Sequence, residues 1–289
     1  MTEEPAFDEI NEAKASMDHI YDQPDPRAYF KELNDLGYAI PGEAKPVFQE
    51  LISQLQSQRP EPINILDLGC SYGVNAALLK HDLSMADLYA HWEKDKIADA
   101  APDEVIENDK RFFTKLPKPE DIRVVGIDVA ENAVDYATKS GLLDDGLTVD
   151  LETELLPAEA RDELASVDLI MSTGCVGYIT KKSFDRLMPV VTGGRKPWIA
   201  NFVLRMFPFD AISQTLSKWG YVTEKLDGRT FVQREFASAE EREQVVEQMI
   251  ENGIDFRGEE ADGQLLAEFY LSRPKSEASR LPIERLIPA

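Results

Sequence analysis

The residues best placed to do chemistry lie where a short apolar run gives way to a helix. The run at 63–68 includes Asp67, the turn Gly-Cys-Ser-Tyr-Gly follows at 69–73, and a helical pattern begins at Val74. Runs of this kind are typical of buried parallel strands. Asp67 leaves a carboxylate at the strand tip, where it accepts hydrogen bonds from a ligand or from the turn amides. Strand, glycine turn and helix N-terminus together predict a site for a nucleotide-like ligand.

This stretch resembles motif I of the class I S-adenosylmethionine (SAM)-dependent methyltransferases, an acid followed by spaced glycines. Asp67, Gly69 and Gly73 match the motif, and Ser71 stands where the family has its middle glycine. Serine is small, so the departure is mild. The resemblance implies SAM as cofactor, with Asp67, Gly69, Cys70 and Gly73 among the residues that bind it.

Other ligand patterns fit this turn less well. A dinucleotide fingerprint would need glycine where Ser71 and Val74 stand, and a phosphate-binding P-loop would need Gly-Lys-Ser/Thr after the turn. A glycine turn that binds nothing also stays open, because many α/β proteins connect a strand and a helix in this way.

A second acid, Asp128, ends the apolar run at 123–128, and Glu131 opens a helix after it. The resemblance implies that Asp128 accepts hydrogen bonds from both ribose hydroxyls of SAM, with Val129 beside it. A carboxylate with two oxygens suits that role. Capping of the following helix is the alternative, since it would also explain an aspartate here.

The resemblance extends to two later strands. After a third strand at 147–151, it implies that Asp150 binds the adenine amino group beside Leu151, with Glu152 as the alternate. After a fourth strand at 166–173, it implies that Ser172 borders the methionine part of SAM.

Candidate residues near the acceptor are fewer. The resemblance implies that Tyr178 projects toward the substrate, and His91 is the one histidine predicted to lie near it. For both, a purely structural role is the alternative. In the family an N-terminal tyrosine often reaches the cofactor, and Tyr29 is favoured over Tyr21 by position. Arg205 is expected to bind a substrate carboxylate or, in the preferred interpretation, to make an ion pair.

The predicted architecture is α/β, with a Rossmann-like, seven-stranded, mostly parallel sheet and helices on both faces. Residues 1–60 are expected to form an N-terminal helical cap with helices at 9–17, from position 25 and at 46–58. Residues 61–289 are expected to form the SAM-binding domain, with a loosely docked tail from Pro274. A helical insertion at about 80–121 separates the first helix from the second strand. It is predicted to form either a lid or wall over the substrate, or an oligomer surface such as that of a homodimer.

The formal net charge of −23 argues against nucleic acid as substrate, because the protein's field would repel it. Solubility or a saline cytoplasm would account for the acidity. The sequence has no run of eighteen apolar residues, so no membrane span is predicted. Cys70 and Cys175 have no metal-ligand spacing around them. They are expected to be free thiols, and the protein is expected to be cytoplasmic.

The leading hypothesis is a methyltransferase that acts on a small metabolite by in-line O-, N- or S-transfer. SAM carries an activated methyl group, so the protein needs mainly to align the reactants and exclude water. A SAM- or nucleotide-binding module without catalysis is the first alternative, and a nicotinamide-dependent oxidoreductase is the second.

Overall fold

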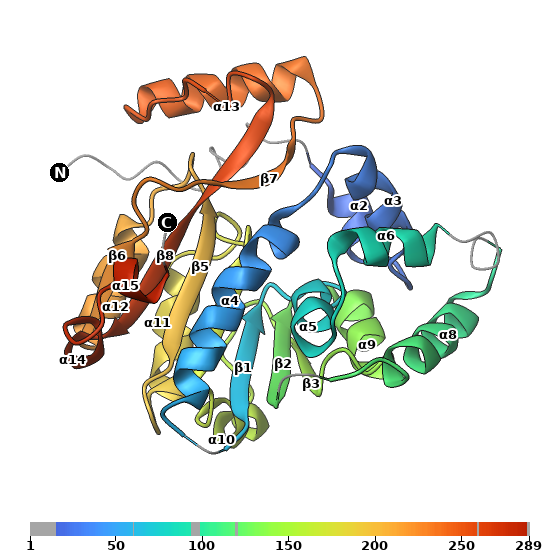
Figure 1. The fold of residues 1–289 in the computed structure, drawn as a ribbon, viewed down its shortest axis with the longest axis horizontal. Coiled ribbons are helices and arrows are strands. Elements are labelled where there is room, and N and C mark those ends of the chain that lie inside the picture. The colour runs from blue at the N-terminus through green and yellow to red at the C-terminus, as the bar shows by residue number, and fades with distance from the viewer. Residues whose placement is uncertain (1–15, 60, 94–98, 119–120, 259, 288–289) are drawn as a thin grey trace.

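A central β-sheet organises the computed structural model, which describes residues 16–59, 61–93, 99–118, 121–258 and 260–287 (Figure 1). The strand order is β3-β2-β1-β4-β5-β8-β6, and β7 also pairs with β8. The strands from β3 to β5 in this order are parallel. Strand β8 pairs antiparallel with β5, and β6 and β7 pair antiparallel with β8. The strands are β1 Ile63–Leu68, β2 Ile122–Asp128, β3 Asp145–Thr148, β4 Leu169–Thr173, β5 Trp198–Leu204, β6 Tyr221–Lys225, β7 Phe231–Glu235 and β8 Gln264–Pro274. The predicted fold class is confirmed.

The seventh position of the sheet is occupied by two strands in line. Both β6 and β7 run antiparallel to the long strand β8, with β6 pairing with its residues 270–274 and β7 with its residues 264–267. The Asp227-Gly228 pair, of a type common in hairpin turns, does not fold β6 back on β7. Eleven residues make β8 long enough to pair with both strands.

Helices cover both faces of the sheet (Figure 1), and side-chain alternation along the strands separates two cores. In β1, Ile63 and Ile65 belong to one core, whereas Leu66 and Leu68 belong to the other. The first core includes α4 Ile40–Gln56, α5 Val74–Lys80 and α9 Glu131–Lys139. The second includes α10 Arg161–Leu164, α11 Lys181–Val191, α12 Asp210–Lys218 and α13 Ala239–Glu251.

The N-terminal helices begin differently from the prediction. The structure has α2 Asp18–Tyr21 and α3 Arg27–Asp35 before α4, while most of the helix expected at 9–17 lies outside the described residues. Helix α4 starts six residues before the expected position 46. Pro41 occupies its first turn, where the missing N–H has no partner to lose, and Pro46 lies inside the helix.

The insertion forms α6 Met85–Trp92 and α8 Pro102–Thr114. Phe30 of α3 stacks on Trp92 of α6 with ring centroids 4.0 Å apart. Asp109 of α8 is fully buried and accepts hydrogen bonds from Trp92 Nε1 at 3.0 Å and Tyr136 Oη at 2.6 Å, with His91 Nε2 at 2.7 Å. The insertion is therefore packed against the N-terminal helices and α9 around this buried carboxylate.

The C-terminal tail, which was expected to be loosely docked, packs against the first core. It forms α14 Lys275–Ala278 and α15 Ile283–Leu286, and Ile283, Leu286 and Ile287 are buried in the first core. The Ile283 amide also donates to Glu224 of β6 at 3.1 Å. Of the helices described, none is both long and apolar enough to cross a bilayer.

Candidate functional site

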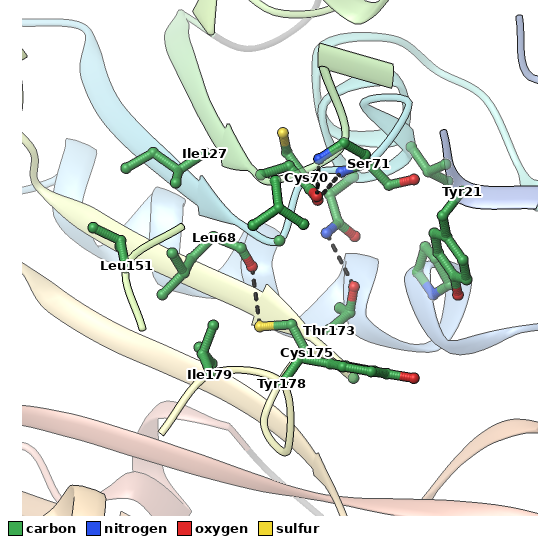
Figure 2. A pocket seen from close by; sticks show the side chains of 18 of the residues that line it. Tyr21, Leu68, Cys70, Ser71, Ile127, Leu151, Thr173, Cys175, Tyr178 and Ile179 are labelled. Atoms are coloured by element: carbon green, nitrogen blue, oxygen red, sulfur yellow. Dashed lines mark hydrogen bonds between the residues drawn. The ribbon is translucent and has the colours of Figure 1, made fainter. Parts of the chain in front are cut away.

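A pocket of about 240 Å³ opens at the carboxyl ends of the parallel strands. Its lining comes from the segments that follow β1, β2, β3 and β4, with further side chains from the N-terminal helices and from β7. Figure 2 shows Leu68, Leu151 and Ile179 toward one side of this pocket and Tyr21 on the other. The edge at which the sequence predicted a ligand site is thus hollowed.

The glycine turn fixes the pocket floor through one tight contact. Gly69 lines the pocket with φ +76°, and a Cβ on it would lie 2.7 Å from the Cβ of Cys175. Cys175 in turn donates from Sγ to the carbonyl of Leu68 at 3.2 Å (Figure 2). The loops after β1 and β4 therefore meet where only glycine fits.

Gly73 does not line the pocket, which corrects its assignment to the cofactor. It precedes α5 with φ +76°, and a Cβ there would meet Ala137 of α9 at 3.1 Å and Leu142 at 3.2 Å. Its role is to let α5 pack against α9. Cys70 does line the pocket, and burial raises the pKa of its thiol well above the ordinary value.

Ser71 replaces the family's middle glycine at a backbone position that favours glycine. Its φ is +44°, the only left-handed value for a non-glycine residue in the described chain. The amide of Ser71 donates to Asp128 Oδ2 at 2.8 Å, while its Oγ is buried against the pocket without a hydrogen-bond partner. The conformation is held by the turn despite a local strain of about 1–2 kcal/mol.

We therefore expect Ser71→Gly to raise the free energy of unfolding by about 0.5–1 kcal/mol. Release of left-handed strain outweighs the greater backbone entropy of glycine in the unfolded chain. Urea unfolding monitored by circular dichroism measures the change. A lower stability of the variant would show that the Ser71 side chain contributes more than its backbone strain costs.

Asp128 stands at the tip of β2, half-buried in the pocket lining. Oδ2 accepts from the Ser71 amide and Oδ1 from the Ala130 amide at 3.1 Å. Burial raises the pKa of Asp128, and these amide hydrogen bonds oppose that rise. The carboxylate offers about four acceptor positions. It therefore joins the two strand-end loops and still keeps capacity for a ligand.

Asp67 lies behind the pocket rather than in its lining. It is fully buried, and its Oδ1 accepts from Asn75 Nδ2 at 3.1 Å. The same amide donates to Thr173 Oγ1 at 3.1 Å (Figure 2), and both Asn75 and Thr173 line the pocket. Burial raises the pKa of Asp67 to about 7. The structure therefore corrects the predicted direct contact of Asp67: it orients Asn75, which reaches the cavity.

The loop after β3 supplies Asp150 and Leu151 to the pocket, as predicted. Strand β3 ends at Thr148, so both residues lie beyond the strand. Asp150 shapes its own loop, accepting from the Glu152 amide at 2.9 Å and from Thr153 Oγ1 at 2.6 Å.

Glu152, the alternate to Asp150, faces α11 instead. Its Oε1 accepts from the amide of Thr180 at 2.8 Å and from Ser183 Oγ at 2.6 Å, at the start of that helix. It is outside the pocket lining. This side chain ties the loop after β3 to α11.

Ser172 is the next correction. It is fully buried within β4 and donates to Asn201 Oδ1 of β5 at 2.8 Å, so it cannot border a ligand. Side chains of successive strand residues point to opposite faces. Thr173 and Gly174, the next residues along the chain, line the pocket instead.

Aromatic residues from the N-terminal helices close one side of the pocket. Tyr29 lines it but is only 2% exposed, and its ring packs against Tyr21, Tyr38 and Tyr72 with centroid distances of 5.4–6.2 Å. The Tyr72 hydroxyl accepts from the Gln23 amide at 2.8 Å and donates to its carbonyl at 2.9 Å. Tyr72, which the sequence did not single out, thereby holds these helices over the glycine turn.

Tyr178 reaches the pocket and His91 does not. Tyr178 follows β4, lines the cavity and is 52% exposed (Figure 2). His91 is buried against Asp109 and stacks on Phe112 with centroids 4.0 Å apart. All three histidines lie in the described part of the chain, and none lines the pocket. The prediction that His91 is catalytic is wrong, because its Nε2 bonds Asp109 and its ring stacks on Phe112 inside the insertion.

Arg205 and the described part of the insertion both lie outside the pocket lining. Arg205 forms ion pairs with Glu260 and Glu268, as the preferred interpretation held. The part of 80–121 that the structure describes contributes nothing to the pocket lining. Within the described residues, no group of three His, Cys, Asp or Glu side chains gathers to hold a metal ion.

Comparison with solved structures finds methyltransferases at low sequence identity. The plantazolicin methyltransferase BpumL, in complex with a pentazolic desmethylPZN analog and S-adenosylhomocysteine (SAH), is 13% identical over 93% of this chain and 98% of that chain, with a TM-score of 0.46. The magnesium protoporphyrin IX methyltransferase ChlM from Synechocystis PCC 6803, with bound SAM, is 8% identical over 93% and 91%, with a TM-score of 0.39. A TehB-like SAM-dependent methyltransferase from Corynebacterium glutamicum is 13% identical over 76% and 86%, with a TM-score of 0.39.

No protein-family model matches the chain, and no curated protein matches its sequence. The strand order, with five parallel strands followed by an antiparallel edge, therefore decides the fold. The chain has a Rossmann-like α/β fold with an antiparallel edge. Fold alone does not fix activity.

Two of the exposed apolar side chains in the described part of the chain belong to the pocket lining. Among the described residues the large hydrophobic side chains that remain exposed are Val129, Leu155, Tyr178 and Ile250. Val129, 64% exposed, and Tyr178 both line the cavity. Apolar groups exposed side by side with convergent polar groups are typical of ligand sites.

Proposed function

We propose that the protein is a SAM-dependent methyltransferase acting on a small molecule. The observation that carries the proposal is the pocket at the ends of β1 to β4, in which the carboxylate of Asp128 stands beside the bare backbone of Gly69. A nucleoside with vicinal hydroxyls suits a carboxylate that keeps free acceptor positions.

The residues around Asp128 fit the nucleoside part of SAM. Val129, Leu151 and Ile179 supply apolar surface for a purine ring, and Asp150 lies next to them as a hydrogen-bond acceptor. Ligand burial would also remove the exposed surface of Val129 from water, at about 25 cal/mol per Å². Asp128 and Asp150 would orient the nucleoside from the ends of β2 and β3.

The methionine part would then lie toward Gly69, Asn75 and Thr173, where the chain offers polar groups rather than apolar ones. Asp67 acts indirectly by holding the Asn75 amide in place. When bound, SAM supplies a methyl group already activated on a sulfonium. The protein's part is to orient the acceptor and to keep water out.

Proton transfer places a further limit on the acceptor. No histidine lines the pocket, and burial raises the pKa of the Cys175 thiol to about 12, which keeps it neutral. The described lining thus offers no histidine base and no thiolate. We infer that the acceptor is a small nucleophile that reacts without a histidine or a thiolate as base, with Tyr178 facing it.

Cofactor titration tests this proposal directly. Isothermal titration calorimetry with SAM, SAH and NAD in parallel is expected to show binding of SAM and SAH alone. A methyl-release assay over a metabolite library then looks for turnover. Binding of NAD without SAM would favour an oxidoreductase, and SAM binding without any turnover would favour a non-catalytic module.

Replacement of Asp128 by asparagine is expected to weaken SAH binding by about 1–3 kcal/mol, or roughly 5- to 150-fold, because charge-assisted hydrogen bonds to the ligand are lost. Asparagine is preferred to alanine, since the side chain also holds the Ser71 and Ala130 amides. Asp135→Asn, on the exposed surface of α9, makes the same charge change as a control. Equal SAH affinity in the wild type and Asp128→Asn would refute the assignment.

A further inference from the structure

A β-bulge in β7 turns one side chain toward the pocket. Val232 pairs with Leu266 and Arg234 pairs with the next residue, Leu265, which leaves Gln233 as the extra residue. Its carbonyl accepts from the Ala39 amide at 2.9 Å, which fixes the bulge against the start of α4. Bulges of this kind re-aim a side chain next to binding sites.

The Gln233 side chain is buried, and its amide oxygen lacks a hydrogen-bond partner. It is 9% exposed, and its Oε1 is buried without any hydrogen bond. The amide lies against Gly174, where a Cβ would come within 2.7 Å of Nε2. A buried amide oxygen with no partner costs free energy in the unbound protein, so a ligand group at this point would satisfy it.

Gln233 also lies where the pocket continues beyond the cofactor region. A second, smaller cavity of about 40 Å³ shares Tyr21, Tyr38, Gly174, Tyr178 and Gln233 with the first. Its other lining residues are Met17, Leu33, Leu204, Arg234 and Leu265. We call the five shared residues the acceptor end of the pocket.

The acceptor end carries no uncompensated charge among the residues described. Arg234, the only charged residue lining the smaller cavity, makes two hydrogen bonds to Glu241, at 2.8 Å and 2.5 Å, and both side chains are buried. Asp128 and Asp150 line only the larger cavity. The three tyrosines instead offer ring surface, which suits a flat ligand.

We infer that the acceptor end binds an uncharged aromatic acceptor and that the amide of Gln233 positions it, with Oε1 accepting a hydrogen bond from an O–H or N–H on the ring. This inference rests on the proposed function for the location of the methyl donor. Gly174 gives the amide its place, since any side chain there would displace it. Gln233 is a positioning residue in this account.

The test uses ring probes with and without a donor on the full-length protein saturated with SAH. Phenol and indole carry the donor, anisole and N-methylindole lack it, and benzoate and benzylamine add charge. Ligand-observed NMR titration gives the affinities. Wild type is expected to bind phenol and indole about five- to tenfold more tightly than their methylated counterparts, as expected for one satisfied buried acceptor.

Gln233→Met keeps the length of the side chain and removes the amide, so the preference for donors is expected to disappear while SAH still binds. The unfolding midpoint is expected to stay the same or rise, because a buried oxygen without a partner is removed. Gln214→Met, at an exposed position of α12, is the matched control and should keep the preference. A preference that persists in Gln233→Met, tighter binding of either charged probe, or no binding of any probe overturns the inference. Failure of SAH itself to bind would instead overturn the proposed function.

Discussion

Replacement of Asp109 by alanine is expected to lower the free energy of unfolding by about 3–5 kcal/mol. The carboxylate is fully buried and accepts hydrogen bonds from Trp92 and Tyr136, with His91 Nε2 also within 2.7 Å. Alanine would leave these groups buried without a partner, and each lost partner costs about 1–3 kcal/mol. Urea unfolding followed by tryptophan fluorescence measures the change.

Two variants on the same helix separate this effect from a general weakness of α8. Lys110→Ala alters the exposed neighbour of Asp109 and should stay within about 0.5 kcal/mol of the wild type. Asp109→Asn keeps one acceptor oxygen and should lie between the wild type and Asp109→Ala. A loss below about 1 kcal/mol in Asp109→Ala would show that this cluster does not hold the insertion in place.

Gly69→Ala is expected to lower the free energy of unfolding by about 2–5 kcal/mol and to weaken SAH binding at least tenfold. The left-handed backbone, with φ +76°, costs a residue with a Cβ about 1–2 kcal/mol. The 2.7 Å approach to the Cβ of Cys175 adds an overpacking cost of about 1–3 kcal/mol. Because the turn lines the pocket, its displacement should carry over to the cofactor.

Gly141 offers a control in which the backbone strain is present without the contact. Its φ is +82°, and a Cβ there would meet nothing within 4 Å. Gly141→Ala is therefore expected to lose only the conformational part, about 1–2 kcal/mol, and to keep SAH affinity. Adding Cys175→Gly to Gly69→Ala removes the clashing atoms and should recover part of the stability. Equal losses in Gly69→Ala and Gly141→Ala would exclude the steric explanation.

The local sequence was enough to predict β1, β2 and the edge that carries the pocket, whereas β3 was predicted at 147–151 and lies at Asp145–Thr148. Apolar runs around Asp67 and Asp128 marked β1 and β2 because buried parallel strands have few polar side chains. The glycine turn between β1 and α5 marked the ligand edge, since its backbone geometry is set locally. The pocket lining includes Asp128, Asp150 and Tyr178, each of which ends or follows a parallel strand at this edge.

Which neighbouring side chains face the cavity was decided only by tertiary structure. Ser172 and Thr173 have similar chemistry, but strand alternation buries the first and presents the second. His91 lies away from the pocket because it bonds Asp109, which is eighteen residues later in the chain. No local sequence pattern reveals that Asp109 is buried. Long-range packing settles such pairings, because the free energy of a buried polar group depends on its partners.

Gln233 shows the same limit at the far end of the chain. Its position two residues after the buried Phe231 was a hint, since it shares that side of an alternating strand. Its approach to Gly174 depends on the bulge in β7 and on the folded sheet, which brings β7 close to the loop after β4. The sequence by itself determined the strands, the glycine turn and the acids at the strand ends, because these depend on residues near one another. Tertiary structure alone decided the acceptor end, because its side chains come from segments that only the folded sheet brings together.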